Sequence, residues 1–84
     1  MVKSLLYAEL FRFFGIRFFF FSNDHLPIHV HVKNADGSAR FEVSPLKLIE
    51  NKGMKNKDIY LAESIIEENA DIIAQKWNEY FDKK

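Results

Sequence analysis

Residues 28–43, which read IHVHVKNADGSARFEV, decide the fold. In residues 28–33, and again in residues 39–43, apolar and polar side chains alternate without a break, which is typical of a strand with one buried face. Between these runs, Asp36-Gly37 is a strong signal for a tight hairpin turn. We therefore predict two antiparallel strands at the centre of a small sheet.

The sequence before this hairpin predicts more of the same sheet. Residues 16–22, which read IRFFFFS, form a short segment rich in aromatic residues, and this favours a strand. Gly15 in front of them is typical of a turn. We expect residues 10–14 to be extended, although the spacing of their apolar side chains also fits a short helix capped by Ser4. The predicted sheet is antiparallel and has three or four strands.

The second half of the chain predicts helices. Ser44-Pro45 matches a helix cap followed by proline at the first helical position, and Gly53 matches a stop, so residues 46–52 are predicted to form a short helix. A longer helix is expected from Asn56, acting as its cap, to residue 81. Its apolar side chains recur every three or four residues and form one stripe. These are Ile59, Ala62, Ile66, Ala70, Ile73, Trp77 and Tyr80, widened by Leu61, Ile65 and Ile72. The predicted class is α+β, with a short and a long C-terminal helix packed on one face of the sheet.

The composition limits what the chain can be. We expect a single domain over residues 1–84, because a chain this short buries only about 60 to 65% of its unfolded surface and cannot support two cores. Twelve basic and twelve acidic side chains give no net charge, so no overall positive field draws the chain onto nucleic acid or anionic lipid. The absence of cysteine excludes disulfides and thiolate metal sites. No apolar stretch approaches the roughly 20 residues of a spanning helix, so we expect a cytoplasmic protein with no membrane partner.

Strand alternation assigns each side chain to a face of the sheet. If helices cover one face, nine side chains point inward. These are Ile16, Phe18, Phe20, Ile28, Val30, Val32, Ala39, Phe41 and Val43. The opposite face then carries Arg17, Phe19, Phe21, His29, His31, Lys33, Arg40 and Glu42. Two phenylalanines are unusual on a solvent-exposed face, so we expect a partner, a second copy or the N-terminal segment to cover them.

The leading hypothesis for this face is a surface that binds another protein. Phenylalanine and arginine side chains are common at the centres of such interfaces. The expected binding residues are Phe19, Phe21, Asp24, His25 and Lys33. This hypothesis predicts a regulatory or interaction module and no enzyme.

Two alternatives involve the histidines. In a toxin-like ribonuclease, His29 and His31 would transfer protons near neutral pH, while Arg17 or Arg40 would hold a phosphate group. In a divalent-metal-binding protein, the ligands would be His25, His29 and His31. His29 and His31 project from the same side of a strand, and His25 would reach in from the loop beside Asp24. No other cofactor is expected.

Three segments carry a resemblance to a known family. Residues 14–16 read FGI, residues 22–32 read SNDHLPIHVHV, and residues 77–81 read WNEYF. Together they resemble the small bacterial proteins known as domain of unknown function 4160. The specific part of the pattern is Asp24-His25, Pro27, His29 and His31, while Ile28 stands where relatives usually have a second proline.

The resemblance implies a compact bacterial α+β protein without an established activity. Relatives are often encoded beside a small protein of the family called domain of unknown function 2442, in pairs that look like toxin and antitoxin modules. The resemblance therefore implies a cognate small protein as partner, with domain of unknown function 2442 as its expected family. A homo-oligomer is a further expectation, and RNA is the partner expected of the ribonuclease alternative.

Overall fold

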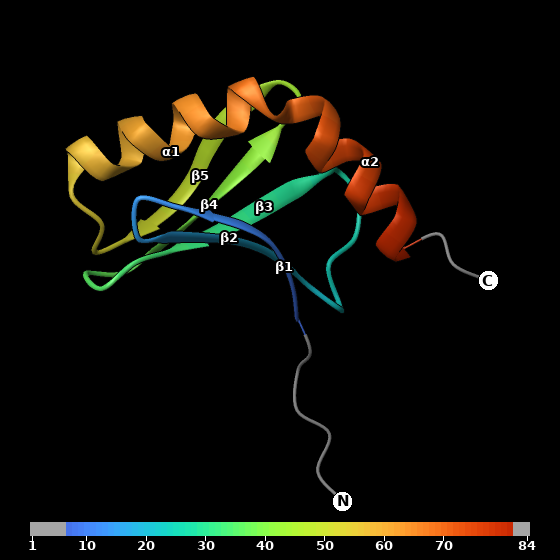
Figure 1. The fold of residues 1–84 in the computed structure, drawn as a ribbon, viewed down its shortest axis with the longest axis horizontal. Coiled ribbons are helices and arrows are strands. Elements are labelled where there is room, and N and C mark those ends of the chain that lie inside the picture. The colour runs from blue at the N-terminus through green and yellow to red at the C-terminus, as the bar shows by residue number, and fades with distance from the viewer. Residues whose placement is uncertain (1–6, 82–84) are drawn as a thin grey trace, which may run out of the picture.

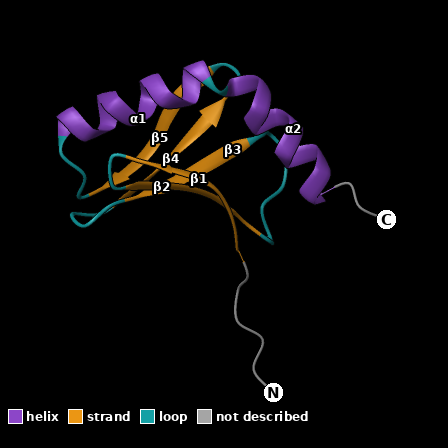
Figure 2. Cartoon of the chain, in the orientation of Figure 1, coloured by secondary structure: helices purple, strands orange, loops and turns teal. Residues whose placement is uncertain are grey.

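Five antiparallel strands form one sheet, and they lie in the order in which they occur in the chain (Figure 1). The structure is a computed structural model that describes residues 7–81. The strands are β1 (Tyr7–Phe13), β2 (Ile16–Phe21), β3 (His29–Lys33), β4 (Ser38–Val43) and β5 (Leu46–Lys52). Two helices follow, α1 (Asn56–Glu68) and α2 (Ala70–Phe81), and both pack on the same face of the sheet (Figure 2). The predicted α+β class is confirmed, but the sheet has five strands and not three or four.

The central hairpin forms as predicted. In the register of β3 and β4, His31 lies opposite Arg40, and His29 lies opposite Glu42. The Asn34 side chain closes the turn, because its Oδ1 accepts hydrogen bonds from the backbone N–H groups of Asp36 at 2.9 Å and Gly37 at 3.1 Å. Asparagine is favoured in turns for this reason.

Residues 10–14 are extended up to Phe13, and the helical alternative for this segment is wrong. They belong to β1 and to the turn after it, while Ser4, the predicted helix cap, lies outside the described residues. Phe14 and Gly15 join β1 to β2 with φ values of +55° and +77°. The two-residue hairpin turn whose twist matches that of the flanking strands requires positive φ at both residues. Glycine adopts a positive φ readily, which explains Gly15 at the second position.

Residues 46–52 form a strand and not the predicted helix. They pair with β4, and Ser44-Pro45 serve as the turn between the two strands. Seven residues make a marginal helix, whereas pairing with β4 satisfies their backbone groups and extends the sheet. The register shifts at Ile49, which is an extra residue between Leu48 and Glu50, so β5 contains a bulge. The bulge breaks the alternation by which a strand is recognised.

The predicted long helix is interrupted at Asn69. This residue has φ −115°, and its Nδ2 donates a hydrogen bond to the carbonyl oxygen of Ile65 at 2.8 Å. Such local side-chain bonds compete with helix continuation. The N-terminal cap also differs, because Lys55 occupies the cap position without a side-chain hydrogen bond and Asn56 is already helical.

The core lies between the sheet and the two helices. Eight of the nine side chains predicted to point inward are buried, and Ile28 is partly buried against them, so the assignment of faces is confirmed. The helices contribute the buried side chains Ile59, Ala62, Ile66, Ile73 and Trp77. Ile72, which was predicted to widen the stripe, is 45% exposed. Within residues 7–81, no helix is long and apolar enough to cross a membrane.

Candidate functional site

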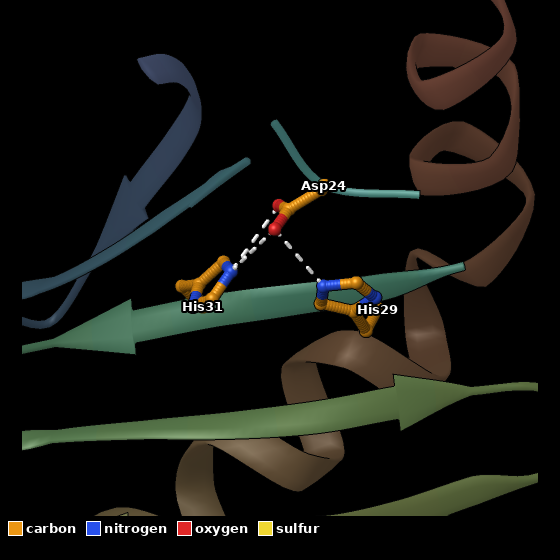
Figure 3. Close-up of side chains that lie close together, drawn as sticks. All are labelled: Asp24, His29 and His31. Carbon is orange, nitrogen blue, oxygen red and sulfur yellow. Dashed lines mark hydrogen bonds and ion pairs between the residues drawn. The ribbon is translucent and has the colours of Figure 1, made fainter. Parts of the chain in front are cut away.

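Asp24, His29 and His31 converge where the loop between β2 and β3 meets α2 (Figure 3). His29 and His31 occupy alternate positions of β3, so both imidazole rings project from the face of the sheet that the helices do not cover. Asp24 reaches them from the loop. The Trp77 ring of α2 lies 5.6 Å from the His29 ring, so the last helix supports one side of the site.

The carboxylate of Asp24 faces both imidazoles. His29 Nε2 lies 3.1 Å from Oδ1. His31 Nε2 lies 3.2 Å from each carboxylate oxygen. One potential ligand atom from each of the three residues lies within 4.8 Å of the others. The side chains are between 9 and 17% exposed, so the group is shielded from bulk water but still accessible.

Backbone contacts fix the orientation of two members of the group. Asp24 Oδ2 accepts a hydrogen bond from the backbone N–H of Phe21 at 2.8 Å, and the Asp24 N–H donates to the Phe21 carbonyl at 3.0 Å. His29 Nδ1 donates to the carbonyl oxygen of Pro27 at 2.9 Å. This last contact determines the tautomer of His29, because a carbonyl oxygen can only accept. The Nε2 atom therefore faces Asp24.

Aromatic rings and charged groups surround His31. The Phe19 ring stacks on it at 5.6 Å, and the Phe21 ring meets it edge-on at 4.6 Å. Burial lowers the pKa of His31, and the nearby charges of His29 and Arg40 act in the same direction, whereas the hydrogen bond and charge of Asp24 oppose them. A lowered pKa favours the uncharged imidazole, which is the form that binds metals.

The structure separates the two arginines that were candidates for holding a phosphate. Arg40 lies directly across from His31 in the sheet. Arg17 instead binds two side chains of β1: its Nε lies 3.3 Å from Glu9, and its guanidinium donates a hydrogen bond to the Tyr7 hydroxyl at 2.7 Å. Of these two arginines, Arg40 is therefore the one that lies beside an imidazole.

His25 lies outside the group that the metal prediction placed it in. The His25 side chain is exposed, and Asp24 occupies the position of the third ligand. The loop orients these adjacent residues differently, so only one of them can face the strand. The role of Asp24 as the residue shared by both imidazoles was not predicted. A carboxylate in the turn just before a His-x-His strand is the signal that could have indicated it.

Phe19 and Phe21 are less available to a partner than predicted. Phe19 is 7% exposed, because the Tyr7 ring packs against it at 5.4 Å and the Arg17 guanidinium lies 5.6 Å above it. We expected a partner, a second copy or the N-terminal segment to cover these phenylalanines, and β1 of the N-terminal segment covers Phe19. Phe21 is half-buried, and Lys33 is exposed at the end of β3.

A comparison with known families identifies the chain. Residues 15–78 match the family described as Domain of unknown function (DUF4160). The chain belongs to the DUF4160 family. The resemblance inferred from the sequence is therefore confirmed, and the matched residues include all three members of the Asp24, His29 and His31 group. Neither curated proteins nor solved structures gave a match to this DUF4160 protein.

Proposed function

We propose that this DUF4160 protein binds a divalent transition-metal ion through Asp24, His29 and His31. The observation that supports the proposal most strongly is the position of His29 between two oxygen acceptors. Its Nδ1 faces the Pro27 carbonyl at 2.9 Å, and its Nε2 faces the Asp24 carboxylate at 3.1 Å. A histidine that ligates a metal usually donates its other ring N–H to a carbonyl or a carboxylate.

The Nε2 atom of His29 faces an oxygen of the Asp24 carboxylate. Since Nδ1 carries the hydrogen, a neutral ring directs the Nε2 lone pair at the oxygen of Asp24. Two electron-rich atoms at this distance repel each other unless a proton or a metal ion lies between them. A metal ion satisfies His29, His31 and Asp24 together, whereas without a metal each imidazole needs its own hydrogen on Nε2 to face the carboxylate.

The distances between the three residues are close to those of a metal site. Ligand atoms bonded to zinc at about 2.0 to 2.1 Å in a tetrahedron are separated by about 3.3 to 3.4 Å. The contacts from Asp24 to the His29 and His31 nitrogens, at 3.1 and 3.2 Å, lie close to that separation. All three ligand atoms lie within 4.8 Å of one another, and a zinc ion would hold the two imidazole nitrogens about 3.3 to 3.4 Å apart.

The donor set also indicates which metals fit. Imidazole nitrogen suits zinc, copper, iron and nickel, whereas magnesium and calcium prefer oxygen alone. Three protein ligands leave a coordination position for water or another ligand, as in zinc sites that perform chemistry. We therefore expect zinc to bind and to keep one exchangeable position.

Zinc titration with matched histidine variants tests the proposal. We expect a single zinc ion per chain and, with free zinc at about 100 times Kd, a stabilisation of about 2.7 kcal/mol and a rise in Tm of about 10 °C or more. His29→Gln should lower zinc affinity by at least about 100-fold, since losing even a supporting residue costs about 10- to 100-fold. Asp24→Asn should do the same.

His25→Gln is the control, because it makes the same chemical change at an exposed histidine that lies outside the group. It should leave zinc affinity unchanged. Circular dichroism of the zinc-free variants separates lost binding from lost folding. A wild-type chain that neither binds zinc nor gains Tm would refute the proposal, and so would loss of binding in His25→Gln alone.

A second candidate function, pairing with a cognate small protein, is favoured by apolar side chains that remain exposed near the site. Leu26 is 69% exposed and Ile49 is 38% exposed. Both border a hollow of about 180 Å³ together with Pro27 and Arg40. Exposed apolar side chains that cluster in this way are typical of binding surfaces.

Leu26→Asp tests the pairing function. The variant should keep its fold and its zinc affinity while losing coelution with a co-expressed protein of the family called domain of unknown function 2442. Coelution that survives Leu26→Asp would count against a pairing surface at this loop.

A further inference from the structure

A hollow of about 370 Å³ lies on the uncovered face of the sheet and shares His31 with the proposed metal site. Its lining includes Phe21, His31, Lys33, Arg40, Glu50 and Lys52. The volume is at the lower end of the range for small-molecule sites, which is about 300 to 1,000 Å³. The hollow therefore fits a small ligand.

The charged side chains around the hollow are mostly positive. Lys33, Arg40 and Lys52 line it, and Glu50 is its one acidic lining residue among residues 7–81. Glu50 already lies 3.7 Å from the Lys52 amine. Glu42, which follows Arg40 by two residues on the same face, borders the adjacent smaller hollow.

Arg40 is the cation best placed to bind a ligand. Within the described part of the chain, no carboxylate lies within ion-pair distance of Arg40 or Lys33, whereas Arg17 and Lys52 have partners. Arg40 is half-buried and lies opposite His31, next to the metal site. A guanidinium offers paired donors whose geometry matches two oxygens of a phosphate group.

We infer that the ligand that completes the metal site carries a phosphate group, bound between the metal ion and Arg40. This inference rests on the proposed metal function. Three protein ligands leave one coordination position, and phosphate oxygen is a suitable ligand for a divalent metal. The hollow beside His31 holds the rest of the ligand, with Lys33 adding charge and the Phe21 ring an apolar wall.

Calorimetry with inorganic phosphate, AMP and the dinucleotide ApA tests the inference on the full chain, with and without a stoichiometric amount of zinc. We expect binding to the zinc-loaded protein that is weakened about tenfold or more when zinc is removed by a chelator. Arg40→Ala should lower phosphate affinity by a similar factor and leave zinc affinity unchanged. Arg40→Lys should retain part of the affinity, since the charge remains but the paired geometry is lost.

Arg12→Ala is the matched control, because Arg12 is an exposed arginine of the edge strand β1 and pairs with Glu9. It should leave both affinities unchanged. The three probes distinguish the source of the phosphate: tighter binding of AMP than of ApA indicates a monoester, and the reverse indicates a diester such as RNA.

The two proposals fail in different ways. Zinc binding without any effect of phosphate, AMP or ApA overturns the phosphate inference and leaves the metal function intact. Phosphate affinity that is the same in Arg40→Ala and Arg12→Ala also overturns it. A chain that binds no zinc overturns the metal function and the phosphate inference with it.

Discussion

Replacing Gly37 by alanine should disrupt the end of the sheet although the backbone of Gly37 is not left-handed. A Cβ atom at this position would lie 2.1 Å from the carbonyl oxygen of Lys52, and 2.8 and 2.9 Å from two backbone atoms of Gly53. Contacts below 3.0 Å are essentially never observed for a real Cβ. The backbone of Lys52 and Gly53, at the end of β5, would have to move by about 1 Å, at the point where Gly53 bridges to Ser38.

The size of the effect follows from what must move. Inserting a methyl group into a packed region costs about 1 to 3 kcal/mol of stability, and here the obstacle is backbone and not a flexible side chain, so we expect about 3 kcal/mol. Gly15→Ala is the matched comparison, because nothing lies within 4 Å of its Cβ but its φ is +77°. A left-handed conformation costs an alanine about 1 to 2 kcal/mol, partly offset by about 0.4 to 1 kcal/mol from the unfolded state, leaving about 1 kcal/mol.

Urea unfolding measures both effects. With an m-value of about 1 kcal/mol/M, the midpoint should fall by about 3 M for Gly37→Ala and by about 1 M for Gly15→Ala. A midpoint of Gly37→Ala equal to or above that of Gly15→Ala would refute the close approach of the β5 end to the central hairpin. A Gly37→Ala variant that does not fold would support this close approach, since the free energy of unfolding of a chain of this length is only about 4 to 13 kcal/mol.

Three further predictions concern the core, a turn and pH. Phe20→Ala should lower the free energy of unfolding by about 3 to 5 kcal/mol and shift the Trp77 fluorescence, because the two rings lie 5.0 Å apart in the core. Unchanged emission would count against this packing of α2. Phe14→Asn should raise stability by about 0.5 to 1 kcal/mol in urea unfolding, since Phe14 is 79% exposed at φ +55° and Asn-Gly suits this turn; a loss of stability would argue against the turn type. In chelator-treated protein, stability should fall as the pH drops below about 6.5, because burial lowers the pKa of His31 and the unfolded chain therefore takes up the proton first. Urea unfolding at several pH values should show that His31→Gln reduces this slope; an unchanged slope would contradict the lowered pKa of His31.

Strict alternation determined which parts of the fold could be predicted from the sequence. The central strands β3 and β4 pair without a bulge, so their period of two is visible and their faces were assigned correctly. The edge strands β1 and β5 each contain a bulge, at Leu10 and at Ile49. An extra residue shifts the pattern by one position, so the pattern of β1 was compatible with a helix, and the pattern of β5 did not outweigh the helix signals of Ser44-Pro45 and Gly53. The break at Asn69 depends on a local side-chain bond that no periodicity reveals.

The candidate site was predicted in part for the same reason. His29 and His31 share a face because they are two residues apart on a regular strand. Their common partner lies in a loop, where the direction of a side chain depends on turns that the sequence specifies weakly. Asp24 and His25 were both named for this region, and only the structure distinguishes the residue that faces the imidazoles from the one that faces solvent.

Imidazole nitrogen resonances can identify the zinc ligands one residue at a time. In a zinc titration of ¹⁵N-labelled protein, we expect the Nε2 resonances of His29 and His31 to shift together and saturate at equal amounts of zinc and protein, while both nitrogens of His25 stay unchanged. Unchanged resonances of His29 and His31 at saturating zinc, or a shift of His25 in parallel with them, would contradict a metal site built by Asp24, His29 and His31.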